Sequence, residues 1–381
     1  MIYAVIFRSV IILFQLAFVF IIASQITIDE LGVYYKNLSI AFLLASLIFA
    51  YPEFVFQSLI SERLMNRNTI KYYLKPLIFL IILLICIAIT TNNELIGAIT
   101  LLLSLTMTNM LRTYLNVLSF KILTMTTQVF EGALKLIFLC LTVSLFDKLK
   151  GFDIINIQII ASLLTIKMIY FLTLRNNSGQ RLKNISSLRR HTNLQILIVI
   201  FNTFINSAYV NFLKIYLSAI DALEEVGLLG LTQQLIGNLV QSINSILQIQ
   251  YGNQILRGKS YFNRAFTPII ALTFVGALSI LFAIYFIFPL FDNEYQNIPF
   301  NYFIFVFIFE LYIIPLSFLI NLYIREKLFN IIIRLHLLMA FAIFAVLIVL
   351  MSTGSLQFSM LLGCIFTFVL FTLYYRKLDN V

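Results

Sequence analysis

The chain has 381 residues, of which 61% are hydrophobic and only 11% are charged, and its mean hydropathy is +0.99. A soluble domain of this size needs a charged, mixed surface, and this composition excludes one. The net charge of +10 does not indicate nucleic-acid binding, because the basic residues gather in short connections between apolar runs.

Twelve apolar runs follow one another along the chain, each near the length that crosses about 30 Å of hydrocarbon as a helix. We expect them at 2–24, 37–60, 75–91, 95–118, 122–146, 154–174, 194–220, 226–250, 266–290, 298–323, 331–352 and 356–375. The sequence therefore predicts an all-α integral membrane protein with about twelve transmembrane helices.

Lysine and arginine are divided unevenly between the connections. Counted from the amino end, the even-numbered connections and the carboxyl tail hold 18, whereas the odd-numbered ones hold 3, namely Lys36, Lys148 and Lys150. Because positively charged connections stay on the cytoplasmic side, this predicts that both termini are cytoplasmic. The longest connection is basic and central, so we expect an N-terminal six-helix bundle at 1–174, a cytoplasmic linker at 175–193 and a C-terminal six-helix bundle at 194–381.

A short stretch of two acids followed by glycine occurs twice. Residues 28–32 are IDELG and residues 223–227 are LEEVG, an offset of 195 that is close to half the chain. Each copy lies outside the membrane in the predicted topology, between the first and second runs of its half. A six-span repeat keeps its orientation, so we expect parallel repeats related by an axis along the membrane normal. Coincidence is the alternative, since acidic residues are common at helix starts.

In the second half, polar residues follow one face of two neighbouring predicted helices at steps of three and four. They are Thr203, Ser207, Asn211, Lys214 and Ser218 in one run, and Gln234, Asn238, Gln241, Ser245 and Gln248 in the next. This spacing keeps the groups on one helical face. We interpret the two seams as the lining of a wet cavity in which Lys214 meets an anion. The alternative is that they bond neighbouring helices to each other.

The first half carries a sparser version of the same pattern. Thr124, Gln128, Glu131 and Lys135 form one face of the run at 122–146. Glu131 precedes Lys135 by four residues, the favourable order for an ion pair within a helix. The pair is therefore either self-neutralising or part of a functional site.

Single charges within other runs are further candidates, because a charge in the membrane needs a partner, water or a route to the interface. Arg8 is a candidate substrate contact, with Gln15 two turns later on the same face, although snorkelling to the cytoplasmic surface also explains it. Glu53 follows Pro52, and Glu310 lies near the middle of its run. Together with Glu131 and Lys135, these two carboxylates are candidates for ion coupling.

Motifs for nucleotide binding, zinc hydrolysis and serine-nucleophile chemistry do not occur in the sequence. Cys86, Cys140 and Cys364 each lie within an apolar run, which favours neither a disulfide framework nor a metal site. We therefore expect no cofactor, no metal and no enzymatic activity. Without an ATP-binding motif, transport would use an ion gradient or the gradient of the substrate.

The whole chain resembles the polysaccharide-export branch of the MOP transporter superfamily, whose Wzx-type members are flippases for O-antigen or capsule repeat units. The resemblance rests on Arg8, on TIDELGVY at 27–34, on EEVGLLGLTQQL at 224–235, on LFDNEY at 290–295 and on the two halves joined by a basic loop. The chain departs from the family at Leu229, where an aromatic residue is usual, and lacks a proline in 246–256.

The resemblance implies two six-helix bundles around a cavity that opens alternately to each side of the bacterial inner membrane. The implied cargo is an undecaprenyl-diphosphate-linked oligosaccharide, with H+ or Na+ as the candidate coupling ion. Polymerase and glycosyltransferases of the same pathway are the implied partners. The alternatives are an O-antigen polymerase, a membrane acyltransferase and another exporter of the superfamily, such as a multidrug MATE transporter. A polymerase usually has a large external loop, whereas the external connections here are short.

Overall fold

The computed structural model describes residues 2–61, 67–91, 93–117, 121–146, 149–176, 211–255 and 329–379, together with residues 204, 268–269, 271, 273, 275, 278 and 306–307. Its long helices are α1 (Ile2–Gln25), α2 (Ile28–Ser61), α3 (Arg67–Thr91), α4 (Glu94–Val117), α5 (Lys121–Leu145), α6 (Gly151–Asn176), α8 (Leu223–Ile255), α12 (Phe329–Thr353) and α13 (Leu356–Asp379). Residues 211–219 are helical too, and no strand occurs among the described residues.

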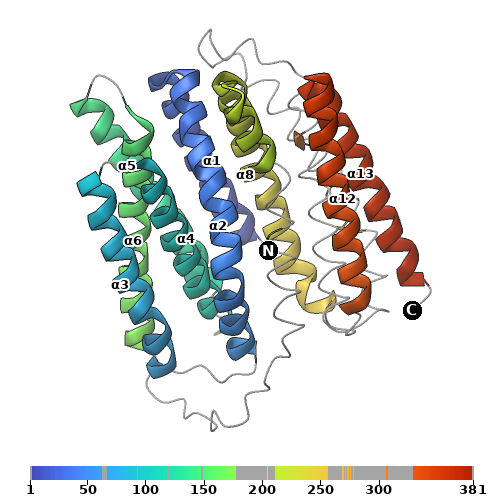
Figure 1. The fold of residues 1–381 in the computed structure, drawn as a ribbon. Helices are drawn as coiled ribbons and strands as arrows, with labels where there is room; N and C mark the ends of the chain where they lie inside the picture. Colours follow the sequence, from blue (N-terminus) through green and yellow to red (C-terminus); the bar gives the residue numbers. More distant parts are fainter. Residues whose placement is uncertain are drawn as a thin grey trace. The chain divides into compact units, whose positions relative to one another are not determined.

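The chain forms two compact units, residues 2–227 and residues 228–381, the latter with Met1. In the first unit, α4 packs against α2, α3 and α6, while α5 packs against α1 and α6 (Figure 1). In the second unit, α12 and α13 form an antiparallel hairpin. Gly354 has a φ of 64° at the tight turn between them, a conformation that glycine adopts without strain.

Helix α4 contacts α2, α3 and α6 in the first unit, and one face of its second half is apolar. Leu103, Met107, Leu111 and Leu115 recur at steps of four and are almost completely buried. They form a core cluster with Met110 and with side chains of α3 and α6, namely Ile81, Ile166 and Ile169. This packing fixes the positions of the polar side chains on α4 that are described below.

Large apolar side chains on the outward faces of α3, α6 and α12 are exposed. Phe79, Phe171, Phe341 and Phe344 are all more than half exposed. In water such faces would drive association, whereas lipid solvates them. Within the described part of the chain, four helices are long and apolar enough to cross a membrane by themselves, at Ile6–Gln25, Glu94–Arg112, Ile122–Leu145 and Gly151–Leu172. The protein is therefore a multi-pass membrane protein.

Two helix starts of the first unit are fixed by side chains that accept backbone hydrogen bonds. The Glu30 N–H donates to Thr27 Oγ1 at 3.4 Å, so Thr27 caps α2. Asn93 caps α4 by accepting from the Leu95 N–H at 3.0 Å. The acidic pair Asp29 and Glu30 therefore belongs to the first turn of α2, and this helix begins before residue 37, where the apolar run predicted it. The apolar pattern missed this turn because its residues are polar.

Buried polar contacts tie α2 to its neighbours. Gln158 of α6 donates from Nε2 to the Tyr34 hydroxyl at 2.8 Å, and Asn37 donates from Nδ2 to Glu94 Oε2 at 2.9 Å. Both bonds satisfy groups that would be costly to leave unpaired in an apolar interior. They hold the first turns of α2 in place against α4 and α6.

The other predicted spans divide into three groups. The run at 75–91 belongs to α3, which begins earlier, at Arg67, and the run at 226–250 belongs to α8, which extends from Leu223 to Ile255. The runs at 2–24, 95–118, 122–146, 154–174, 331–352 and 356–375 agree with α1, α4, α5, α6, α12 and α13 to within a few residues. Most of the runs at 194–220, 266–290 and 298–323, and the linker from residue 177 onward, lie outside the described residues. The boundary between the two six-helix bundles therefore stays a prediction.

Candidate functional site

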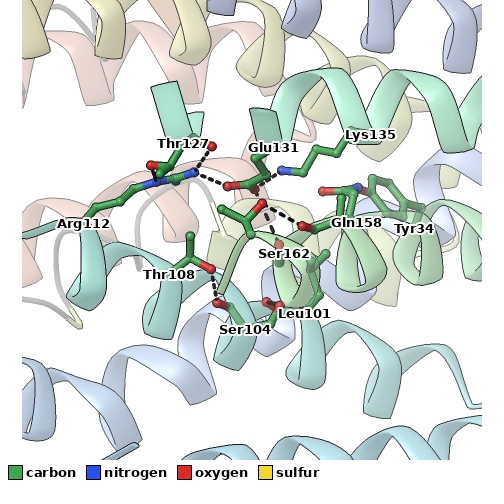
Figure 2. Close-up of polar contacts among 12 residues, drawn as sticks. Tyr34, Leu101, Ser104, Thr108, Arg112, Thr127, Glu131, Lys135, Gln158 and Ser162 are labelled. Carbon is green, nitrogen blue, oxygen red and sulfur yellow. Dashed lines mark hydrogen bonds and ion pairs between the residues drawn. The ribbon is translucent and has the colours of Figure 1, made fainter. Parts of the chain in front are cut away.

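Small polar side chains gather where α4, α5 and α6 face one another. The buried members are Thr100, Ser104, Thr108, Thr124, Thr127, Gln158, Ser162 and Thr165. Several of the hydroxyls donate to a carbonyl of their own helix, as Thr108 does to Ser104 and Ser104 does to Leu101, both at 2.7 Å (Figure 2). A hydroxyl satisfied in this way can lie in an apolar interior at little cost. This arrangement supplies a polar lining among the three helices.

At the centre of this lining, Glu131 of α5 binds two cations. Arg112 of α4 donates from Nη2 to Glu131 Oε2 at 2.5 Å, and the Lys135 ammonium lies 2.6 Å from Glu131 Oε1 (Figure 2). Exposed fractions are 6% for the Glu131 side chain, 11% for Arg112 and 21% for Lys135. The predicted pair of Glu131 and Lys135 is confirmed, but it is not self-neutralising, because Arg112 makes it a cluster of three charges.

Further hydrogen bonds fix the two ends of the Arg112–Glu131 pair. The Arg112 guanidinium also donates to the Thr127 carbonyl at 3.2 Å and to Thr127 Oγ1 at 3.4 Å. Ser162 of α6 approaches Glu131 Oε1 at 3.5 Å. The pair thus joins α4, α5 and α6. A buried ion pair gains net stability only when such additional bonds satisfy its remaining donors and acceptors.

Helix α1 adds polar groups beside α5. The two helices approach closely at Gly132, where an added Cβ would lie 3.1 Å from the Phe14 ring. Arg8 Nε and Gln15 Oε1 on α1, and Gln128 Oε1 on α5, are buried and have no hydrogen-bond partner within the described part of the chain. Unpaired polar groups in an interior usually mark the place of water, an ion or a ligand.

Among the described residues, cations outnumber carboxylates in this region. Arg112 of α4 and Lys135 of α5 both bind the Glu131 carboxylate, and Arg8 of α1 is a third cation beside Arg112. The Arg8 guanidinium lies close enough to Arg112 for the two charges to interact. Excess positive charge inside a membrane protein is costly unless an anion or water accompanies it. We define these four residues as the cation cluster.

Lys214 lies outside the cation cluster, beside an aromatic ring of α2. It is 5% exposed, and its ammonium lies 5.5 Å from the centre of the Tyr35 ring. Tyr35 in turn packs edge-on against Tyr34, with 5.0 Å between ring centres. Lys214 is therefore buried against α2 and does not extend to an exposed surface. Asn211, one turn earlier, is also buried, with 8% exposed.

The described side chains of the polar seam on α8 are more exposed than apolar side chains on another face of the same helix. Gln234 and Asn238 are partly exposed, whereas Leu235 and Val240 are buried. The Gln241 and Glu53 side chains and the whole of Glu310 lie outside the described residues. The roles that the sequence suggested for these residues stay predictions.

Arg112 is the residue that the sequence reasoning misassigned. It is one of the 18 basic residues that the predicted topology assigns to the even-numbered connections and the carboxyl tail, but it lies within α4 and is nearly buried. The signal that could have identified it is the apolar run at 95–118, which continues on both sides of Arg112. A charge inside a run needs a partner, and Glu131 on the next run is an acid with the same need. The unequal charge distribution between the connections does not depend on this one residue.

Comparison with known proteins identifies the fold but no close relative. No family model matches the chain, and no curated protein matches it. A multidrug resistance MATE family transporter of the MOP superfamily is similar in its outward-facing conformation, with a TM-score of 0.60 and 13% identity over 100% of this chain and 94% of that chain. In its inward-facing conformation such a transporter has a TM-score of 0.59 and 12% identity, with 98% of both chains covered.

A third solved structure is a MOP superfamily transporter from Pyrococcus furiosus, with a TM-score of 0.55 and 13% identity over 99% of this chain and 94% of that chain. Its description states that reverse polarity of the binding pocket suggests a different function. At these identities the likenesses show the fold alone. The chain has the all-α membrane fold of MOP and MATE transporters, with its transmembrane helices in two bundles, as the sequence predicted.

Proposed function

We propose that the chain is a flippase that moves undecaprenyl-diphosphate-linked oligosaccharides outward across the bacterial inner membrane by alternating access, with both termini in the cytoplasm. The fold supports transport in general, because solved MOP transporters share it over nearly the whole chain. The class of cargo needs a separate argument from the chain's own residues.

The observation that carries the proposal is the surplus of buried positive charge in the cation cluster. Arg112 and Lys135 share one carboxylate, and no described residue accepts a hydrogen bond from the buried Arg8 Nε. A diphosphate diester bears a negative charge on each phosphate, so it complements this surplus. Arginine binds phosphate oxygens in a fixed fork, and lysine meets them as a mobile point charge.

The second half of the chain supplies groups suited to the glycan. Asn211, Gln234, Asn238 and Gln241 carry amides, which both donate and accept hydrogen bonds and therefore pair well with sugar hydroxyls. Lys214 lies one turn from Asn211 and offers a further cation for the diphosphate during passage. We assign Arg8 and Lys214 to the diphosphate and these amides to the sugar residues.

Coupling to H+ or Na+ is assigned to Glu53 and Glu310. Glu131 is already bound by two cations, which stabilise its charged form and leave it ill suited to release and take up ions. Glu53 and Glu310 are carboxylates within apolar runs of the sequence. Each carries a charge that water or a coupling ion would have to accompany.

Export of small molecules is the second candidate function, favoured by the likeness to multidrug MATE transporters. The cation cluster distinguishes the two candidates. An organic cation entering between α1 and α5 would be repelled by the surplus positive charge, whereas an anionic lipid would be attracted. We therefore favour the anionic cargo.

The proposal is tested by deleting the gene in its own host. We expect lipid-linked repeat units to accumulate in the inner membrane and surface polysaccharide to be lost. The parent gene should restore both, and Arg112→Gln with Lys135→Gln should not do so at equal protein abundance. Lys167→Gln, which removes an exposed lysine of α6, is the matched control and should restore both. Unchanged surface polysaccharide without accumulated lipid-linked glycan would overturn the proposal.

A further inference from the structure

The Glu131 carboxylate divides its two oxygen atoms between cations of two different helices. Oε1 binds the Lys135 ammonium, and Ser162 of α6 approaches the same oxygen atom at 3.5 Å. Oε2 binds Arg112 of α4, and Figure 2 shows the two cations on opposite sides of the carboxylate. If Arg112 left Glu131, the bonds of Oε1 would therefore remain.

Lys135 is the cation that Glu131 keeps more easily. The two residues are four apart on α5, in the order that favours an ion pair within a helix. This pairing does not depend on the position of a neighbouring helix. Loss of its only cation would be costly for a buried carboxylate, whereas Glu131 without Arg112 would stay paired with Lys135. Arg112 is therefore the partner that can be exchanged at the lower cost.

The bonds of Arg112 use one edge of its guanidinium group. Nη2 donates to Glu131 and to the Thr127 carbonyl, and Nε donates to Thr127 Oγ1. An edge of this kind binds a carboxylate or a phosphate group through two parallel hydrogen bonds. Glu131 thus occupies part of a site that also fits a phosphate group. A phosphate group that approached this edge would compete with Glu131 for Arg112.

The surrounding charge favours the arrival of a phosphate group. Arg8 lies close enough to Arg112 for the two positive charges to repel each other. The negative charge of Glu131 is shared between Arg112 and Lys135, so it offsets this repulsion only in part. A second anion beside Arg112 would lower the repulsion further.

We propose that Arg112 exchanges its partner, from Glu131 in the empty protein to a phosphate group of the cargo. Arg112 is then a direct substrate contact, and Glu131 is a positioning residue that holds the unoccupied arginine in place. Lys135 keeps Glu131 paired while Arg112 is bound to the phosphate. The identity of this phosphate as part of a lipid-linked diphosphate rests on the proposed function. The exchange itself needs only an anion that carries phosphate groups.

Binding of a soluble headgroup analogue to the full-length, detergent-solubilised protein tests the exchange. The probe is symmetric dimethyl diphosphate, in which each phosphate carries one methyl ester and one negative charge, and titration calorimetry measures its Kd. Glu131→Gln removes the competing carboxylate and should tighten binding about tenfold, whereas Arg112→Gln should weaken it by a similar factor. Binding that either substitution leaves unchanged would overturn the proposal.

A double-mutant cycle tests the part assigned to Lys135. Lys135→Gln should weaken binding in the parent protein, because Glu131 then depends on Arg112 and releases it less readily. In the Glu131→Gln background the same substitution should have a much smaller effect, because no carboxylate remains there to be held. Equal losses in the two backgrounds would show that Lys135 acts on the probe directly, and would overturn its part in the exchange.

Glu131→Asp covers the case in which Glu131→Gln does not fold. It keeps a negative charge for Lys135 but shortens the side chain by one methylene group. It should therefore hold Arg112 less firmly and also tighten binding, and folded Glu131→Asp with the Kd of the parent protein would contradict the exchange.

Glu94→Gln is the matched control. It removes a carboxylate from the start of α4, about 27 Å along the helix from Arg112 at 1.5 Å per residue, and should leave the Kd unchanged. A tightening equal to that of Glu131→Gln would show that net charge governs binding, and would overturn the proposal.

Inorganic phosphate is the second probe, because a site for free phosphate would prefer it to a diester. We expect dimethyl diphosphate to bind more tightly, and the opposite order would exclude the headgroup as the ligand. Neither probe carries a polyprenyl chain or a sugar. Calorimetry can therefore contradict the exchange while gene deletion still shows accumulated glycan, so the two failures are distinguishable.

Discussion

Arg112 donates a hydrogen bond of 2.5 Å to Glu131, 19 residues later in the chain, and the pair joins α4 to α5 inside the membrane-spanning part of the first unit. Such a pair is difficult to form, because both ions lose their hydration. Once it is formed, it is costly to break, since the ion that remains has no equivalent partner.

We expect Glu131→Gln to lower the free energy of unfolding by about 3 kcal/mol, because it leaves Arg112 and Lys135 without their buried counter-ion. Arg112→Gln should cost less, because Lys135 still pairs with Glu131 in that variant. The double variant with methionine at both positions should lose much less than the sum of the two. Unfolding of detergent-solubilised protein measures this, with Lys167→Gln as the exposed control. Single variants as stable as the control would show that the pair does not stabilise the bundle.

Lys214→Gln should reduce outward movement of the lipid-linked glycan at normal protein abundance, while Lys214→Arg should retain part of it. The physical reason is that the buried ammonium places positive charge beside α2, where it would attract a passing anion, and arginine keeps the charge with a different geometry. Surface polysaccharide in the gene-deleted host is the readout. Full activity of Lys214→Gln at matched expression would remove Lys214 from the anion path.

Cysteines at Gln234, Asn238 and Gln241 should react with water-soluble thiol reagents in protein lacking the native cysteines. Leu235→Cys and Val240→Cys, on the buried face of α8, should be protected. The difference is expected because the polar face borders a wet cavity. Equal protection of both faces would instead mean that the seam holds neighbouring helices together.

Apolar periodicity predicted the helices well wherever the structure describes them, because an isolated span in lipid must satisfy its own backbone. It missed the first turns of α2 and α3, where charged residues such as Asp29, Glu30 and Arg67 interrupt the apolar pattern. The first turn of α2 is helical because of its cap and its packing against α4 and α6, which hydropathy does not record.

The candidate site could be predicted only in part. The spacing of Glu131 and Lys135 within one helix predicted their pair, whereas the Arg112 contact depends on which helices are neighbours. The repeat predicted that Gly32 and Gly227 are equivalent, but equivalence alone does not bring two glycines together. In the structure the first turns of α2 and α8 meet at these two glycines, which depends on tertiary packing.

The central claim is that the chain moves a lipid whose headgroup is a diphosphate. Proteoliposomes containing the protein should be prepared with two polyprenyl lipids that carry the same sugar, one through a diphosphate and one through a neutral linkage. The rate at which an external glycosidase reaches inner-leaflet sugar measures movement. We predict that the protein accelerates this rate for the diphosphate lipid alone, and that Arg112→Gln with Lys135→Gln abolishes the acceleration. Equal acceleration of both lipids, or of neither, would contradict the claim.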